Sequence, residues 1–482
     1  MLLKNSAQTL TTQLAARFGQ RIRDRLLAPG ARLPSVRLCA QQQKVSPSTV
    51  VGAYDMLLAQ GLVEARKNRG FYVREGQNSA LTPMDTAQAA IKSAANAKGG
   101  MAELPPPVAP VNATALIRSM FHGVSDKPQP GAGVLPTEWL QNTFLASALR
   151  QHCSVQAINS MSLQYGEPAG DLGLRRALSN RLAHIALHVA PEHIITTLGA
   201  THALDLVSRT LLRTGDYVMV EEPGWAVEFA RLNALGMRIL PVPRRADGPD
   251  LEVMARYCAA YAPKLFVSVS VLHNPTGFSL SPGSAYRVLQ LANQHNFHVL
   301  EDDTYSHFAP EHATRLCALD GLQRTIYVSG FSKILAPNWR VGYMAAPKAL
   351  AEALLDTKLL TTLTTPALLE KAVAWCIDQG QLRRHAERVR TRMDAARARS
   401  VKLAVAHGCT LAAEPAGMFG WVDTGVDTDV LAQRMLDMGY LLAPGALFHA
   451  TRQASSLMRI NFATTQEAQF WASFAKLRDE QR

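Results

Sequence analysis

The stretch "YVSGFSKILAPNWRVGYMAAP", residues 327–347, sets Lys333 directly after a serine and Arg340 seven positions later. It begins within a short apolar run, "TIYVS" at 325–329, which is rich in β-branched and aromatic residues and is followed at once by glycine. Such a run predicts a buried strand. An amine is therefore expected just beyond the end of a strand, and the fold depends on which other strands end beside it.

Four further runs of this kind precede it, at 194–198, 217–221, 265–271 and 297–301, and longer helical stretches separate them. This alternation predicts an α/β domain with a largely parallel sheet from about residue 113 onward. The segments that follow the four runs are "GATHAL", "EPGW", "HNPTG" and "DDTYSH". Ligands bind beyond the carboxyl ends of parallel strands, so all five segments should meet at one site.

The chemistry of these segments suits one ligand that carries a phosphate, an aromatic cation and an aldehyde. Gly199 and the small residues after it open a helix, where free backbone N–H groups favour phosphate. The other groups are the Trp225 ring, the Asn274 amide, the Asp302 carboxylate, the Tyr305 hydroxyl, the Lys333 amine and the Arg340 guanidinium. Pyridoxal 5′-phosphate (PLP) needs an acid at its ring nitrogen and a lysine at its aldehyde. Each residue alone has a plain structural explanation, but their shared place after successive strands favours the cofactor.

The 482 residues, 48% of them hydrophobic, suffice for two or three folded units. The net charge of +12 is concentrated at the N-terminus, because residues 1–75 contain twelve Lys or Arg and only four acids. This excess predicts a polyanionic partner for residues 1–76. Residues 77–112 are rich in Ala, Asn, Gly and Pro, which predicts a flexible linker before a large unit at 113–482.

Residues 10–26 place apolar side chains at every fourth position, which predicts a helix, and "PSVRLCAQQQ" predicts a short second one. In "KVSPSTVVGAYDMLLAQG" we expect a third helix with Ser46 as N-cap, Pro47 at its first position and Gly61 at its stop. Its inner face would be Val50, Ala53, Tyr54 and Leu57, and Ser48, Thr49 and Gly52 would lie outside. "LVEARKNRGFYV" then predicts a hairpin, or wing.

The pattern of LPS-x-R, S-x-S-T-V, A-Y-x-x-L and G-L-V resembles the GntR-type winged helix-turn-helix over residues 8–75. The resemblance implies DNA contacts by Arg37, Ser46, Ser48, Thr49, Arg66, Arg69 and Gly70. Pro47 stands where many relatives have a donor, so the base preference of relatives does not transfer.

Residues 113–482 resemble the aspartate-aminotransferase-like PLP enzymes of fold type I, with a small C-terminal α+β subdomain. The resemblance is carried by "YGEPAGDLGLR", "TTLGATHAL", "EEPGW", "HNPTG", "EDDTY", "SGFSKILAPNWRVGY" and "LMRINFA". It implies an internal aldimine at Lys333, a pyridinium salt bridge at Asp302, ring-oxygen contacts from Asn274 and Tyr305, and stacking by Trp225. It further assigns phosphate to Gly199, Ala200, Thr201, Ser332 and Arg340, a partner-subunit contact to Tyr165, and a substrate carboxylate to Arg459. Two departures, Gly330 and Ala200, leave fewer hydroxyls around the phosphate than relatives have.

A GntR-type reader joined to an aminotransferase-like domain is the layout of the MocR regulators. The chain is therefore expected to be a PLP-dependent transcriptional regulator that senses an amino compound or the vitamer, and to form a homodimer on DNA. Two alternatives remain open: a working aminotransferase with an appended DNA-binding unit, and a cofactor-free fold used for dimerisation. The six cysteines are scattered singly, so neither disulfides nor a metal site is expected, and a cytoplasmic setting without membrane association fits.

Overall fold

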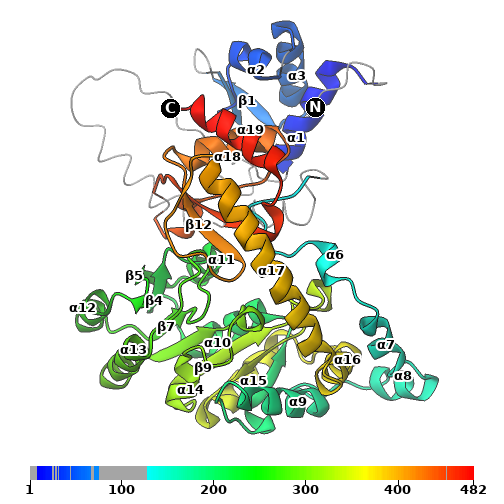
Figure 1. The fold of residues 1–482 in the computed structure, drawn as a ribbon. Helices are drawn as coiled ribbons and strands as arrows, with labels where there is room; N and C mark the ends of the chain where they lie inside the picture. The colour runs from blue at the N-terminus through cyan, green and yellow to red at the C-terminus, as the bar shows by residue number, and fades with distance from the viewer. Residues whose placement is uncertain are drawn as a thin grey trace.

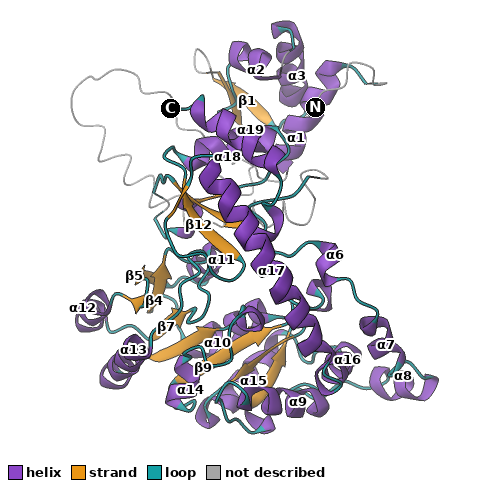
Figure 2. Cartoon of the chain, in the orientation of Figure 1, coloured by secondary structure: helices purple, strands orange, loops and turns teal. Residues whose placement is uncertain are grey.

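The computed structural model describes residues 8–23, 27, 30, 32–43, 45–66, 70–74, 127–451 and 453–482. They form an N-terminal unit, a large α/β part around an eight-stranded sheet, and a smaller C-terminal α+β subdomain (Figure 1, Figure 2). The predicted linker lies outside the described residues. Among the helices of the described ranges, none has both the length and the apolar character that a membrane crossing requires.

The N-terminal unit is a winged helix-turn-helix. Its elements are α1 (Leu10–Arg23), α2 (Val36–Gln43), α3 (Pro47–Ala59), β1 (Val63–Arg66) and β2 (Gly70–Val73), and the two strands pair antiparallel. The expected inner face of α3 is fully buried and packs on Leu14 and Phe18 of α1. The Ser46 side chain caps α3 by accepting from the Thr49 N–H at 3.2 Å, as the sequence predicts.

The large sheet has the order β3-β10-β9-β8-β7-β4-β5-β6. Its strands are β3 (Ile194–Thr197), β4 (Tyr217–Glu222), β5 (Arg238–Arg245), β6 (Gly248–Pro249), β7 (Leu265–Ser268), β8 (His298–Asp302), β9 (Thr325–Gly330) and β10 (Gly342–Ala345). Strands β5, β4, β7, β8 and β9 run parallel, whereas β10 is antiparallel to both β9 and β3. All five predicted strands exist, whereas β5, β6 and β10 were not predicted, and β10 is an antiparallel insertion between β3 and β9.

Helices flank this sheet on both faces (Figure 2). Three helices, α6 (Thr137–Leu140), α7 (Phe144–Arg150) and α8 (Val155–Ser162), instead lie to one side of it (Figure 1). The flanking helices are α9 (Leu172–Ala183), α10 (Ala200–Leu211), α11 (Ala226–Ala234), α12 (Leu251–Tyr261), α13 (Pro282–His295), α14 (Leu316–Asp320), α15 (Lys348–Thr361) and α16 (Ala367–Asp378). Their apolar faces and the β-branched strands form the buried core of the large part.

The long helix α17 (Gln381–Ala406) runs from the large sheet to the C-terminal subdomain (Figure 1). That subdomain contains an antiparallel sheet of order β11-β12-β14-β13, with helices α18 (Thr428–Asp437) and α19 (Ala468–Asp479) beside it. The strands are β11 (Thr410–Leu411), β12 (Phe419–Asp423), β13 (Ala443–Pro444) and β14 (Leu457–Asn461). The winged unit lies against this subdomain, on the side away from the large sheet (Figure 1).

Candidate cofactor site and DNA-binding face

Lys333 lies three residues beyond the end of β9 and points at the chain segment that precedes α6. Its Nζ donates a hydrogen bond of 2.7 Å to the carbonyl oxygen of Gly133. Burial, with help from the cations Arg459 and Arg340, lowers the pKa of the Lys333 ammonium to about 8. A neutral amine is thus much more accessible here than at an ordinary lysine, and the neutral form is the nucleophile that attacks a carbonyl.

Asp302 is the last residue of β8 and is buried. Its Oδ1 accepts hydrogen bonds from the backbone N–H and the hydroxyl of Thr304. Burial raises the pKa of the Asp302 carboxyl to about 6, although the two Thr304 hydrogen bonds favour the ionised form. A cationic ring nitrogen at this position would restore the low pKa, because an opposite charge stabilises the carboxylate.

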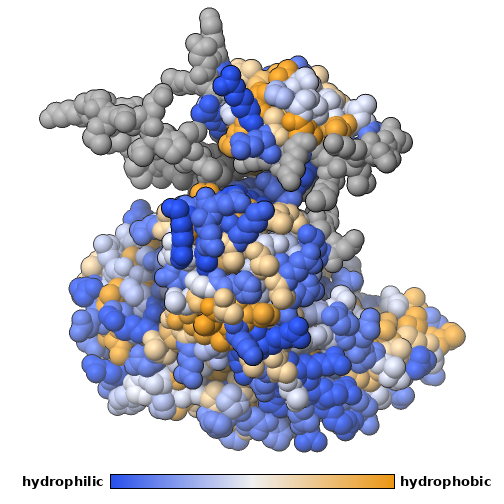
Figure 3. Space-filling view, turned by 45° about the horizontal axis from the view of Figure 1, so that its top comes forward, coloured by the Kyte–Doolittle hydropathy of each residue, from blue (hydrophilic) through white to orange (hydrophobic). Residues whose placement is uncertain are grey.

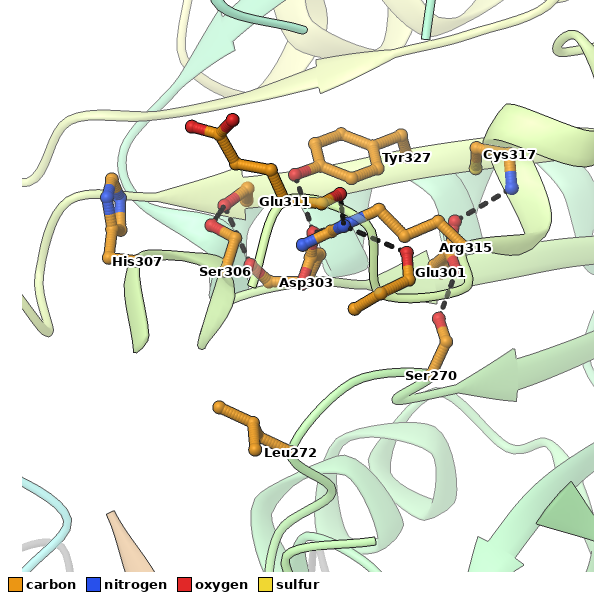
Figure 4. Close-up of polar contacts among 12 residues, drawn as sticks. Ser270, Leu272, Glu301, Asp303, Ser306, His307, Glu311, Arg315, Cys317 and Tyr327 are labelled. Atoms are coloured by element: carbon orange, nitrogen blue, oxygen red, sulfur yellow. Dashed lines mark hydrogen bonds and ion pairs between the residues drawn. The ribbon is translucent and has the colours of Figure 1, made fainter. Parts of the chain in front are cut away.

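The acids on either side of Asp302 belong to a separate buried network (Figure 4). Glu301 accepts hydrogen bonds from the Ser270 hydroxyl and from the backbone N–H groups of Leu316 and Cys317. Asp303 forms an ion pair of 2.6 Å with Arg315 and accepts from the Tyr327 hydroxyl at 2.9 Å. The motif "EDDTY" therefore contains two structural acids around one that remains for a ligand, as strand alternation dictates.

Asn274, Tyr305 and Arg459 form one hydrogen-bonded group. The Asn274 amide nitrogen donates to the Tyr305 hydroxyl at 3.2 Å, and Nη1 of Arg459 donates to the Asn274 oxygen at 3.0 Å. The Arg459 guanidinium lies 4.3 Å from the centroid of the Phe419 ring and 5.2 Å from that of Phe448. The group joins β14 of the C-terminal subdomain to the loop after β7 and to the turn after β8.

Arg459 is a buried cation, and within the described ranges it forms no ion pair with a carboxylate. Its Nη2 donates to the carbonyl oxygen of Gly131 at 2.6 Å, and its Nε is buried without a hydrogen-bond partner among the described residues. Burial lowers its pKa to about 10. A buried guanidinium held only by carbonyls and rings is suited to an incoming carboxylate.

The start of α10 forms the other end of the site. Gly199 has φ of 80°, and a Cβ at this position would lie 2.3 Å from Nη2 of Arg340, so only glycine lets the guanidinium approach so closely. Arg340 donates to the Ser332 hydroxyl at 3.0 Å and to the Leu198 carbonyl at 3.0 Å. Ala200 and Thr201 occupy the first turn of the helix. A guanidinium and a helix N-terminus together favour a phosphate.

Two predicted residues stand apart from these contacts. Trp225 is half-buried at the N-terminus of α11, directly after β4. Tyr165 is 82% exposed, so a single chain does not bring it into the buried cluster.

The residues around Lys333 fit PLP as a set: an amine, a buried carboxylate, a hydroxyl beside an amide, and a cationic helix start. A Cβ built on Gly133 would lie 3.8 Å from both Lys333 Nζ and Arg459 Nη2, which shows that the two cations face the same glycine. The sequence reasoning did not single out this segment. A signal was available in "QPGAGVLP", where two glycines lie between two prolines.

On the winged unit, Arg37, Ser46, Ser48, Arg66 and Gly70 are all exposed, and Thr49 is half-buried. Arg66 forms an ion pair with Glu64 and lies 4.5 Å from the centroid of the Tyr72 ring. Arg69 lies outside the described residues. Gly52 was expected on the DNA-facing side but lies at the contact between α3 and α1, where an added Cβ would be 3.0 Å from Thr11.

Comparison with known proteins agrees with this architecture. Residues 125–470 match the model of the family "Aminotransferase class I and II", and residues 10–73 match "Bacterial regulatory proteins, gntR family". The chain is 26% identical to the HTH-type transcriptional regulator YisV of Bacillus subtilis, over 92% of this chain and 91% of that one. It is 28% identical to the probable rhizopine catabolism regulatory protein MocR of Rhizobium meliloti, over 76% and 71% of the two chains.

Among solved structures, the kynurenine aminotransferase of Pyrococcus horikoshii, in complex with PMP, is 26% identical and superposes with a TM-score of 0.68. The match covers 76% of this chain and 94% of that one. The chain therefore belongs to the aminotransferase class I and II family, and the gntR-family domain at its N-terminus makes it a MocR-type transcriptional regulator.

Proposed function

We propose that this regulator binds PLP covalently at Lys333 and uses the occupied site to sense an amino compound or the vitamer itself. When bound, PLP supplies an aldehyde that reacts with amines and a ring that accepts electrons. The observation that carries the proposal is that Lys333, with its lowered pKa, and Arg459, which forms no ion pair with a described carboxylate, both face Gly133. One group suits an aldehyde and the other a carboxylate.

The other residues would bind and orient. Asp302 would hold a proton at the ring nitrogen, because its buried carboxylate forms no ion pair with any of the described residues. Asn274 and Tyr305 would contact the ring oxygen, and Trp225 would stack on the ring. Phosphate would be bound by Gly199, Ala200, Thr201, Ser332 and Arg340, where the guanidinium already lies over the helix start.

A homodimer is part of this proposal. Leu360, Leu363, Leu163 and Tyr165 are exposed by 89%, 49%, 78% and 82%, an unusual set of apolar surface residues. Leu163 and Tyr165 follow α8, Leu360 lies in the last turn of α15 and Leu363 follows it. The segments after these two helices are adjacent, because a Cβ on Gly166 would lie 3.8 Å from the Thr365 carbonyl. Figure 3 shows hydrophobic residues on the projecting edge that carries α7 and α8. A second copy would cover this surface, and Tyr165 would reach the partner's cofactor.

DNA binding would use Arg37, Ser46, Ser48, Thr49, Arg66, Arg69 and Gly70 of the winged unit, and the protein would act in the cytoplasm. The deciding experiment is binding of the full-length protein to the duplex upstream of its own coding sequence, with and without PLP and a panel of amino acids. Specific binding that changes with ligand supports the sensor. Specific binding that is indifferent to PLP and to every amino acid would remove the sensing role.

An active aminotransferase is the second candidate, because Lys333, Asp302 and Arg459 are all present and a solved relative has that activity. Measuring catalytic turnover and DNA affinity in the same samples distinguishes the enzyme from the sensor. Conversion of amino acid to keto acid over many cycles, with DNA affinity unchanged throughout, would favour the enzyme over the sensor.

A further inference from the structure

Two arginines of the winged unit bind the C-terminal subdomain instead of facing solvent. Arg21 forms an ion pair of 2.6 Å with Asp437, the last residue of α18, and Arg17 donates to the Asp437 carbonyl at 2.6 Å. Arg17 also donates to Gln43 at the end of α2. The Arg21 side chain is only 14% exposed. Two cations at the C-terminus of a helix are favoured by its dipole as well as by the carboxylate. We call Arg17, Arg21 and Asp437 the latch.

The turn that directly follows Asp437 is bonded to residues 127–134, which we call the strap. Lys127 donates to the Met438 carbonyl at 2.9 Å, and the Gln129 side chain accepts from the Leu441 N–H at 2.9 Å. The Gly131 N–H in turn donates to the Leu441 carbonyl at 2.7 Å. If the strap moves, the turn after α18 must therefore move with it, because otherwise the hydrogen bonds between the two segments would break.

The other side of the strap faces the candidate cofactor site. The Gly131 carbonyl accepts from Arg459 at 2.6 Å, and the Gly133 carbonyl accepts from Lys333 at 2.7 Å. Asn461 also holds the strap backbone, because its side-chain amide donates to the carbonyl oxygens of Ala132 at 3.0 Å and Val134 at 2.7 Å. The strap carbonyls thus accept hydrogen bonds from the two cations that the proposed ligand would bind.

We propose that the strap and the latch form one device that couples occupancy of the site to the attachment of the DNA-binding unit. A ligand that binds Lys333 and Arg459 replaces the two hydrogen bonds that these side chains donate to the strap. The strap and the turn at 438–441 then shift, and this shift weakens the latch. Linkage requires the reverse as well: weakening the latch must ease displacement of the strap. The inference rests on the proposed function in one respect only, which is that PLP is taken as the ligand of the site.

The test uses the full-length protein and two latch variants, Asp437→Asn and the double variant Arg17→Gln with Arg21→Gln. Hydrogen–deuterium exchange is first measured without ligand on peptides that cover the strap and α1. Both variants should accelerate exchange at the strap by about two- to fivefold, because partly exposed ion pairs contribute little individually. The matched control is Glu480→Gln, which removes the Arg434–Glu480 ion pair of the same subdomain and should leave the strap unchanged.

PLP is then added. It should accelerate exchange at α1 in the wild type but not in the latch variants, and the variants should bind PLP about two- to fivefold more tightly. Combining the two variants should have less than the sum of their separate effects, since both remove the Arg21–Asp437 ion pair. Unchanged strap exchange in the ligand-free variants would overturn the coupling, whatever PLP does. Failure of the wild type to bind PLP would count against the proposed function, and the ligand-free comparison would still decide the coupling.

Discussion

The candidate cofactor site and the DNA-binding face use charge in opposite ways. Around Lys333 the charged groups are few: Asp302 and Arg459 are buried, Lys333 is half-buried, and burial shifts the pKa values of all three. On the winged unit the basic groups are many, and Arg37 and Arg66 are exposed. Salt screens exposed charges and hardly affects buried ones, so the two halves should respond differently to ionic strength and to pH.

The largest expected effect is at Lys333. Borohydride reduction of the PLP-treated protein, followed by peptide mass spectrometry, should place the cofactor on Lys333, and Lys333→Ala should abolish the attachment. Lys358 is the matched control, because burial lowers its pKa to about 8 as well, yet it is enclosed near Thr196 and Thr365. Attachment at Lys358 in the wild type would show that a low pKa, without the site geometry, is enough.

Arg459 comes next. Arg459→Gln should weaken binding of amino-acid carboxylates to the PLP-loaded protein by about 100-fold, because a charged hydrogen-bond pair in a buried site is lost. Spectroscopic titration with an amino acid and with the matching decarboxylated amine measures this. The amine lacks the carboxylate, so its affinity should fall little in Arg459→Gln. Equal losses for both ligands would mean that Arg459 supports the structure and does not recognise the ligand.

A third effect concerns the stability of the ligand-free protein. The folded-state pKa of Lys333 is lowered, so the folded protein binds fewer protons than the unfolded chain between about pH 8 and 10.5, and stability should rise with pH across this window. At pH 7 the partly buried Lys333 ammonium destabilises the folded state. Lys333→Met should therefore raise the free energy of unfolding at pH 7 by about 1–2 kcal/mol, after allowance for partial solvent screening.

Chemical denaturation of both proteins at pH 7 and pH 10 measures this difference. The advantage of Lys333→Met should shrink toward pH 10, as the wild-type lysine loses its proton in the folded state above about pH 8. A difference that stays constant with pH would assign it to side-chain packing.

The smallest effect is expected at the DNA face. Arg37→Gln should weaken DNA binding severalfold and reduce the slope of log affinity against log salt by about 0.9, the contribution of one phosphate contact. Arg21→Gln is the control, since Arg21 is paired with Asp437 and should leave the slope unchanged. If Arg21→Gln reduces the slope and Arg37→Gln does not, the assignment of the DNA-facing side is wrong.

Sequence patterns predicted the winged unit and the sheet well because both rest on local signals. The Ser46 cap, the inner face of α3 and the five strands follow from capping chemistry and from apolar periodicity. Strand β10 escaped because its antiparallel insertion between β3 and β9 is decided by long-range packing: a Cβ on Gly342 would lie 2.5 Å from the Gly199 backbone. Gly52 was misplaced for the same reason, since helical periodicity does not reveal how α1 crosses α3.

The side chains that gather around Lys333 were predictable, because parallel strands bring their carboxyl ends to one edge. The strap was not, because its contribution comes from backbone carbonyls, and every residue has one. Glu301 and Asp303 were also hard to distinguish from Asp302 by sequence, because all three are adjacent acids. In the structure Glu301 binds Ser270 and Asp303 binds Arg315, on another side of the strand from Asp302.

The hydrogen bonds from Lys333 and Arg459 to the strap have a consequence for the concentration at which the protein responds. A ligand must compete with Gly131 and Gly133, which are tethered and always present, so its apparent affinity is its intrinsic affinity multiplied by the fraction of molecules with the strap displaced. Changes in the strap sequence would thus tune the response threshold without altering any residue that touches the ligand. A lineage of such regulators could adjust its sensitivity in this short segment while keeping the same chemistry of recognition.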